Sequence, residues 1–391
     1  MPDQISERAS RVYRDAIVID THNDMFTRVL DEGFDPDVRH SAREGHTDIP
    51  RLVESGITAQ FMAAWVDAPY ALTRPDESFA RAIRYIDAIH ATIERNPDTL
   101  ILATDAEGIM RAKREGKVAI LIGVEGGHAI EDSLEKLREL HRRGACYLTL
   151  TWNNGNSWAG SSIGEHETRT GGLTPFGEEV IRELDRLGML VDLSHVSEET
   201  FYDALAVSTR SVITSHSCAR SLSDHPRNLT DDQLRAIARN GGVAQLNFFP
   251  LFLDTAYREA YEKVEAGIAG RRAASGADPS APLSDDLRSL RTSLIACIPA
   301  VPLAVVLDHI DHMVRVAGID HVGALGSDFD GISSTPSGLE DVTRIPVLAQ
   351  ALLDRGYSDA DVMKLLGGNV MRVMGEGREG TGDRKQKTGN R

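Results

Sequence analysis

Eight apolar, strand-like segments alternate with amphipathic stretches along this 391-residue chain. The strand-like segments cover residues 16–22, 57–65, 118–126, 147–152, 190–195, 211–216, 242–249 and 321–329. Helices are predicted near residues 77–96, 133–143, 175–187, 198–208, 231–239, 302–317 and 358–374. Strands that alternate with helices indicate βαβ units and a parallel sheet. Eight such units favour an α/β fold of the (β/α)8 TIM-barrel type, with a doubly wound open sheet as the alternative.

Three of the predicted helices carry clear start signals. Thr174 is followed by Pro175, which places a capping hydroxyl before a proline in the first turn. Thr230 precedes Gln233 by three residues, and Ser358 stands in the same relation to an aspartate. These signals predict where the helices begin and support the alternation of strands and helices.

The length of the chain admits one large domain. A (β/α)8 barrel takes about 250 residues and accepts insertions, so residues 1–374 are predicted to form a single domain. Residues 251–301 interrupt the alternation after the seventh strand, with polar helical pieces around a Gly- and Pro-rich middle. This insertion is compatible with a lid over the mouth of the barrel or with a peripheral helical hairpin. Residues 375–391 lack aliphatic side chains and are predicted to form a disordered tail.

Charge and composition narrow the expected partners. The formal net charge is −16 and no basic stripe occurs outside the tail, so a nucleic-acid partner is not expected. The first residues lack the pattern of a secretory signal, and no segment approaches the ~20 apolar residues of a membrane span. The three cysteines share no CxxC spacing, which argues against a disulfide framework. We therefore expect a cytoplasmic protein that does not bind membranes.

Side chains that can bind metal follow most of the apolar segments. They are His22, Asp24, Glu125, His195, His216 and Asp328. A parallel barrel gathers the C-terminal ends of its strands on one face, so these side chains are expected to lie close together. Imidazole and carboxylate ligands without thiolate suit Zn²⁺, and Mn²⁺, Co²⁺ and Fe²⁺ accept similar ligands. The pattern predicts a metal-dependent active site.

Each candidate ligand also has a purely structural interpretation. His22 and Asp24 could form a polar strand end, and Glu125 could form a buried salt bridge instead of bridging two metal ions. His195 and His216 are harder to explain in this way, because each follows a serine at the end of an apolar run. Together they are typical of two imidazole ligands on one metal ion.

Asp328 is the candidate general acid and base. Placed at the end of the eighth strand, it could take a proton from water and deliver it to a leaving amine. Asp330 is its competitor, because strand alternation would put both carboxylates on the same face. Asp330 also precedes Gly331, which is typical of a turn, so the residues alone leave the choice open.

Seven segments of the chain form a recognisable combination: IDTHND, GVEGGH, YLTLTWNN, GLTPFGEEVIRELDRLGMLVDLSHVS, VITSHS, PRNLTDDQL and HVGALGSDFDG. Together they resemble the membrane (renal) dipeptidase family of the amidohydrolase superfamily. The similarity runs from about residue 12 to residue 374. It implies a (β/α)8 barrel that holds two zinc ions and hydrolyses dipeptides.

The resemblance assigns the candidate ligands to two zinc ions that share one carboxylate. The sets it implies are His22 with Asp24, His195 with His216, and Glu125 as the bridge. It further implies that Arg227 binds the carboxylate of the substrate and that Asp328 moves the proton.

The chain departs from the family pattern after the fourth strand. Characterised dipeptidases have a histidine there that contacts the scissile carbonyl, whereas this chain has Trp152, followed by Asn153 and Asn154. Tryptophan donates a single N–H bond and cannot act as an imidazole does. An asparagine one position further on could supply the missing donor to the carbonyl oxygen. We therefore include Trp152 and Asn153 among the predicted substrate-binding residues.

The expected function is that of a binuclear zinc dipeptidase. A hydroxide between the two ions would attack the amide carbonyl of a small dipeptide, with C-terminal D-residues as a further class of substrate to test. Another amide or lactone hydrolase of the superfamily, acting for example on N-acyl amino acids, is one alternative. A catalytically silent accessory protein is a more distant one. The expected partner is a small dipeptide-like molecule, and a homodimer is a candidate assembly.

Overall fold

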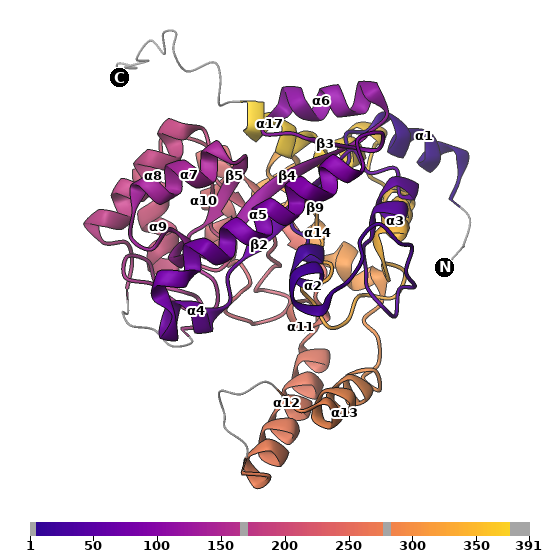
Figure 1. The fold of residues 1–391 in the computed structure, drawn as a ribbon. Helices are drawn as coiled ribbons and strands as arrows, with labels where there is room; N and C mark the ends of the chain where they lie inside the picture. The colour runs from indigo at the N-terminus through magenta and orange to yellow at the C-terminus, as the bar shows by residue number, and fades with distance from the viewer. Residues whose placement is uncertain (1–4, 165–170, 277–282, 376–391) are drawn as a thin grey trace.

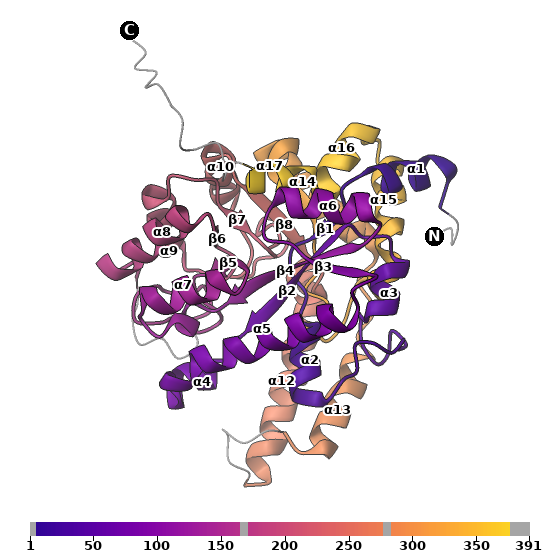
Figure 2. The same ribbon diagram turned by 45° about the horizontal axis from the view of Figure 1, so that its top comes forward.

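Eight parallel strands form a nearly closed barrel, and Figures 1 and 2 show the helices around it. The structure is a computed structural model that describes residues 5–164, 171–276 and 283–375. The strands, in their order around the barrel, are β1 (Ile19–Asp20), β2 (Ala59–Trp65), β4 (Val118–Glu125), β5 (Ala145–Thr149), β6 (Leu190–Asp192), β7 (Ile213–Thr214), β8 (Val243–Asn247) and β9 (Val322–Gly326). The predicted barrel is therefore confirmed, and the open-sheet alternative is wrong.

The barrel closes between its first and last strands. The amide of Thr21 donates to the carbonyl of Leu325 at 3.0 Å, and the amide of Asp24 donates to the carbonyl of Phe329 at 2.8 Å. A parallel bridge between Asn23 and Phe329 continues this pairing beyond the two strands. The closure brings the loops after β1 and β9 next to each other.

Two apolar layers surround the strands. Inside the barrel, side chains such as Ile19, Phe61 and Leu121 form a buried cluster that fills the space between the strands. A larger cluster lies between the strands and the helices outside them. The interior is thus packed with side chains in the manner of TIM barrels.

The predicted helices are all present. They are α5 (Ser78–Arg95), α7 (Leu134–Arg142), α8 (Pro175–Leu187), α9 (Glu198–Val207), α10 (Asp231–Asn240), α14 (Leu303–Ala317), and α16 (Asp359–Met363) with α17 (Asn369–Gly375), which a π-helical turn joins. The hydroxyls of Thr174 and Ser358 cap α8 and α16 as expected. Thr230 and Gln233 form both bonds of a capping box at α10.

Several short helices and one short strand were not predicted from the sequence. They are α1 (Glu7–Asp15), α2 (Met25–Glu32), α3 (Ile49–Glu54), α4 (Ala68–Thr73), β3 (Leu100–Leu102), α6 (Ala106–Glu115) and α15 (Ile345–Asp354). Strand β3 pairs with the first half of β4 and is too short to show a periodic pattern.

Most of the strands also end earlier than predicted. The carboxylates of Asp20 and Asp192 accept the backbone amides of His22 and Ser194, two residues further on. In such turns the backbone amides donate to a side chain and are not available for hydrogen bonds to the neighbouring strand. Glu125 is the last residue of β4, but the other candidate ligands lie in the loops just after the strands rather than in the strands themselves.

The insertion after β8 forms a helical hairpin. Helix α11 (Pro250–Leu253) precedes α12 (Thr255–Ala274) and α13 (Asp285–Ile295), and Figure 1 shows the last two projecting away from the barrel. Near the base of the hairpin, the hydroxyls of Tyr257 and Ser334 are hydrogen-bonded at 2.6 Å. Most of the Gly- and Pro-rich middle and nearly all of the predicted tail, residues 376–391, lie outside the described residues.

Candidate active site

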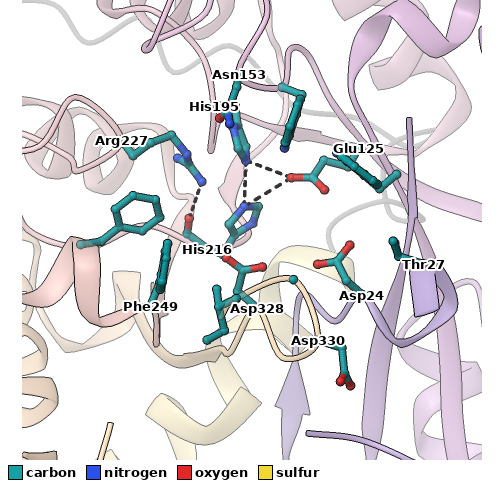
Figure 3. A pocket seen from close by; sticks show the side chains of 15 residues that line it. Asp24, Thr27, Glu125, Asn153, His195, His216, Arg227, Phe249, Asp328 and Asp330 are labelled. Atoms are coloured by element: carbon teal, nitrogen blue, oxygen red, sulfur yellow. Dashed lines mark hydrogen bonds and ion pairs between the residues drawn. The ribbon is translucent and has the colours of Figure 1, made fainter. Parts of the chain in front are cut away.

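A cavity of about 250 Å³ opens at the C-terminal ends of the barrel strands (Figure 3). The predicted site residues that line it are Asp24, Glu125, Trp152, Asn153, His195, His216, Arg227 and Asp328. His22 is fully buried beside them. No described residue of α12 or α13 lines the cavity, whereas Phe249 and Phe252 at α11 do. The insertion therefore contributes its first turn to the wall of the cavity.

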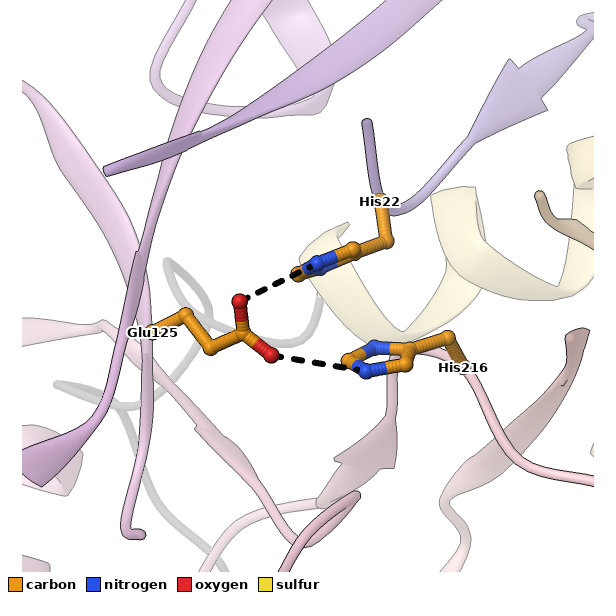
Figure 4. A group of neighbouring side chains, drawn as sticks. All are labelled: His22, Glu125 and His216. Atoms are coloured by element: carbon orange, nitrogen blue, oxygen red, sulfur yellow. Dashed lines mark ion pairs between the residues drawn. The ribbon is translucent and has the colours of Figure 1, made fainter. Parts of the chain in front are cut away.

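The carboxylate of Glu125 lies at the centre of the candidate ligands. Its Oε1 atom is 2.9 Å from Nε2 of His195 and 3.5 Å from Nε2 of His216. Its Oε2 atom is 3.4 Å from Nε2 of His22, which is also 3.3 Å from Oδ2 of Asp24. Figure 4 shows Glu125 between His22 and His216. The two oxygens of one carboxylate thus face two different sets of ligands.

The arrangement of donor atoms fits divalent metal ions. Two groups of three residues have ligand atoms that all lie within 4.8 Å of one another. One group is His22, Glu125 and His216, and the other is His22, Asp24 and Asp328. Nε2 of His195 and Nε2 of His216 are only 3.0 Å apart. Nε2 of His22 is buried and makes no hydrogen bond of good geometry within the described part of the chain. Converging imidazole nitrogens and carboxylate oxygens of this kind are typical metal ligands.

The buried carboxylates of the site favour the binding of a cation. Although burial lowers the pKa of His22, contacts with Tyr147, Glu125 and Asp24 raise it well above its ordinary value. Burial likewise opposes ionisation of Glu125, but His22 and His195 hold the pKa of that carboxyl below its usual range. The carboxylates around His22 thus favour a positive charge at this place, which a metal ion would supply.

The other two histidines are held neutral. Burial, assisted by the charge of Arg227, lowers the pKa of His195 to about 3. Burial and the neighbouring positive charge of His22 lower the pKa of His216 well below its ordinary value. A neutral imidazole keeps a lone pair available to a metal ion.

Two of the histidines have partners on their far nitrogens. Nδ1 of His22 is 2.9 Å from the hydroxyl of Tyr147, and Nδ1 of His216 is 2.7 Å from the hydroxyl of Ser215. Such contacts orient metal ligands and fix which nitrogen is free. The role of Tyr147 was missed, because it lies inside a strand, where an aromatic residue is typical of a packed core. Ser215 was noticed only as the neighbour of a histidine.

Asp328 is held in an unusual backbone conformation. Its φ of 61° is rare for a residue with a side chain, and such outliers cluster at functional sites. Its Oδ2 accepts a hydrogen bond from the amide of Asn247 at 2.9 Å. A Cβ atom on Gly331 would lie 2.4 Å from Oδ2 of Asp24 and 2.5 Å from Oδ1 of Asp328, so a larger residue there would displace these carboxylates. Burial, together with the charges of Asp24 and Glu125, raises the pKa of Asp328 to about 8.

Asp330 has a different environment. Its Oδ1 accepts the backbone amide of His46 at 2.8 Å and lies 3.4 Å from the guanidinium of Arg28. In Figure 3 its carboxylate points away from the group that contains Asp328. Both aspartates line the cavity, but strand alternation is not the reason, because β9 ends at Gly326 and both lie in the following turn with positive φ.

Arg227 is buried beside the ligands. Only 3% of the residue is exposed, and its Nη2 donates to the carbonyl of His216 at 3.2 Å. Its Nη1 has no hydrogen-bond partner among the described residues. Burial lowers the pKa of Arg227 to about 10, which still leaves it charged at neutral pH. A buried cation with free donors on the wall of a cavity can bind an anionic group.

The tryptophan that departs from the family pattern belongs to an aromatic wall. The ring of Trp152 packs edge-on against Trp65, with centroids 5.0 Å apart. Asn154 is buried and donates to the carbonyl of Gly155 at 3.1 Å. Asn153 lines the cavity, and its side chain forms no hydrogen bond with the described residues. Asn153 is therefore the asparagine that can reach a bound molecule.

The membrane dipeptidase model, peptidase family M19, matches residues 6–387 of the chain. The protein belongs to this family. It is accordingly a metal-dependent dipeptidase, a hydrolase of peptide bonds, which confirms the predicted class of enzyme. None of the helices in the described ranges has both the length and the apolar character needed to cross a membrane.

Solved structures agree with this membership. The probable dipeptidase PvdM from Pseudomonas aeruginosa is 25% identical, with a TM-score of 0.81 over 95% of this chain and 98% of that one. A metallopeptidase from Rhodobacter sphaeroides, liganded with a phosphinate mimic of L-Ala-D-Ala, is 25% identical over 92% and 99%, with a TM-score of 0.73. Dipeptidase AC, a metallopeptidase of family M19, is 26% identical over 92% and 98%, with a TM-score of 0.72.

Proposed function

We propose that this dipeptidase is a binuclear zinc enzyme whose metal ions share Glu125. The single observation that carries the proposal is the placement of the two Glu125 oxygens. One faces His195 and His216, and the other faces His22, beside Asp24. Zinc is the proposed metal because the donor set holds imidazole and carboxylate groups and no thiolate.

The residues around the proposed metal site would each have a separate role in dipeptide hydrolysis. When bound, the ions would make a water molecule acidic and polarise the scissile carbonyl. Asp328, which lines the cavity, would take a proton from that water and deliver it to the departing amine. Arg227 would bind the free carboxylate of the dipeptide through its unpaired Nη1. Phe249, Phe252 and the two tryptophans would exclude water from the reacting groups.

Asn153 is the proposed replacement for the family histidine. Its side-chain amide lines the cavity and is free to donate to the carbonyl oxygen as negative charge develops there. A neutral hydrogen bond contributes roughly 0.5–1.5 kcal/mol. Asn153→Ala is therefore expected to lower kcat for a dipeptide about two- to tenfold, with the metal content unchanged. Steady-state kinetics with elemental analysis checks this. A variant with wild-type kcat would remove Asn153 from the mechanism.

Arg227 provides a test of what the cavity binds. Its planar guanidinium can form two parallel hydrogen bonds to a carboxylate, which lysine cannot reproduce. Arg227→Lys is expected to raise KM for dipeptides roughly tenfold, because hydrogen bonds to charged groups contribute about 1.5–3 kcal/mol and lysine keeps only part of that. The metal content should stay the same.

The matched control is a dipeptide amide, which lacks the carboxylate. It should be a poor substrate for the wild type and lose little more in Arg227→Lys. Equal losses for the free acid and the amide would show that Arg227 does not recognise the carboxylate.

The substrate itself is tested by a panel of compounds. Zinc-reconstituted protein should hydrolyse L-L dipeptides, and L-D dipeptides are included because the Rhodobacter sphaeroides relative is liganded with an L-Ala-D-Ala mimic. N-acyl amino acids belong in the same panel, since the wall formed by Trp65 and Trp152 offers apolar contacts to an acyl chain. Faster turnover of N-acyl amino acids than of every dipeptide would favour the alternative amide hydrolase.

A further inference from the structure

A buried carboxylate outside the cavity connects the loops that carry two of the candidate ligands. Asp192, at the end of β6, is 0% exposed. Its Oδ1 accepts the amide and the hydroxyl of Ser194, at 3.1 and 2.7 Å, and the amide of Ser215 at 2.8 Å. Its Oδ2 accepts the hydroxyls of Thr149 and Ser215, both at 2.6 Å. One side chain thus holds the residues that immediately precede His195 and His216.

The hydroxyl of Ser215 links Asp192 to a ring nitrogen of His216. It lies 2.6 Å from Oδ2 of Asp192 and 2.7 Å from Nδ1 of His216. A hydroxyl has one proton to donate, and a bond to a carboxylate is stronger than one to a neutral acceptor. The proton of Ser215 therefore goes to Asp192. The oxygen of Ser215 must then accept a proton from Nδ1 of His216.

We propose that Asp192 is a positioning residue that acts through Ser215 to keep the proton of His216 on Nδ1. Nε2 of His216, which lies 3.0 Å from Nε2 of His195, then has its lone pair free for a metal ion. The inference rests on the proposed two-metal site. It adds a residue that neither binds metal nor lines the cavity.

The substitution Asp192→Asn should reverse the direction of the hydrogen bond between Ser215 and Nδ1 of His216. The two backbone amides that face Oδ1 cannot become acceptors, so the carbonyl oxygen of the asparagine must take that place. Its NH₂ group then faces the hydroxyls of Ser215 and Thr149 and donates to both. The hydroxyl of Ser215 lies 2.7 Å from Nδ1 of His216 and 3.0 Å from the hydroxyl of Ser194, so it would then donate its own proton to Nδ1, the closer acceptor. The single N–H proton of the neutral imidazole would then sit on Nε2 instead of Nδ1, and Nε2 could no longer bind metal.

The test compares four variants with the wild type. They are Asp192→Asn, Ser215→Ala, the double variant of these two, and Thr149→Val as the control. Thr149→Val removes a buried donor to the same carboxylate oxygen but leaves the link from Asp192 through Ser215 to His216 intact. For each protein, titration of the metal-free form with zinc against a chromophoric chelator gives the two stepwise dissociation constants. Thermal unfolding of the metal-free forms reports any purely structural loss.

We expect Asp192→Asn to weaken the binding of one zinc ion roughly 10–100-fold, the usual effect of losing a supporting contact behind a ligand. Ser215→Ala should weaken the same ion less, and Thr149→Val should leave both ions unchanged. In the Asp192→Asn background, Ser215→Ala should strengthen zinc binding, because it removes the wrongly directed donor. A merely structural role would not produce this reversal of sign.

Several outcomes would overturn the inference. They are unchanged zinc binding in Asp192→Asn, an equal effect of Thr149→Val, and a double variant that is weaker than Asp192→Asn. If Asp192→Asn does not fold, wild-type zinc binding by Ser215→Ala overturns it as well. A wild type that binds only one zinc ion contradicts the proposed two-metal site instead, so the two failures can be distinguished in the same titration.

Discussion

Replacing Asp328 with Asn is expected to lower kcat for a dipeptide about 10²–10⁴-fold, the scale of general acid–base catalysis. The amide can neither accept nor release the proton that Asp328 is proposed to move. It can still occupy the same turn, because its shape is nearly the same and asparagine tolerates positive φ. Both metal ions should therefore remain bound. Steady-state kinetics and elemental analysis on the same preparation check the two halves of this prediction.

Asp330→Asn is the matched control. The two aspartates share a turn and a positive φ, but Oδ1 of Asp330 accepts the amide of His46 and lies beside Arg28. We expect a much smaller loss in kcat from this substitution. If Asp330→Asn proves the more damaging of the two, proton transfer belongs to Asp330.

Glu125→Gln is expected to abolish activity by removing both metal ions. A neutral amide offers one oxygen where the carboxylate offers two, and its NH₂ group would face either His22 or the pair formed by His195 and His216. The affinity of both ions should fall by far more than the roughly 10–100-fold loss associated with a supporting contact. Elemental analysis after dialysis, together with dipeptidase assays, measures both effects.

A suitable comparison for Glu125→Gln is Asn153→Ala, which changes the same cavity but no proposed ligand. That variant should keep its full metal content. Retention of one tightly bound ion by Glu125→Gln would show that Glu125 serves a single metal ion and does not bridge two.

The barrel could be predicted from the sequence because the strand-like apolar runs and the helix-start signals indicated the same alternation of strands and helices. Buried runs such as residues 118–125 form strands, and caps such as Thr230 with Gln233 start helices where expected. The clustering of His22, Glu125 and His216 also follows from the fold, since parallel strands bring their C-terminal ends together. Residue type and position after a strand were sufficient to find these side chains.

Other parts of the site depend on backbone geometry that no residue pattern reveals. The separation of Asp328 from Asp330 arises because β9 ends early and both residues adopt positive φ. Tyr147 and Asp192 support the histidines from positions that look like ordinary strand residues. Their roles became visible only when the partners of individual atoms were known.

The most direct test of the two-metal site is the zinc stoichiometry of the wild-type protein, measured together with activity. Metal-free protein is titrated with zinc while dipeptide hydrolysis is followed. A site in which Glu125 faces two sets of ligands predicts saturation at two ions per chain, with full activity reached only as the second ion binds. Full activity at one ion per chain, with no second ion bound in excess zinc, would contradict it.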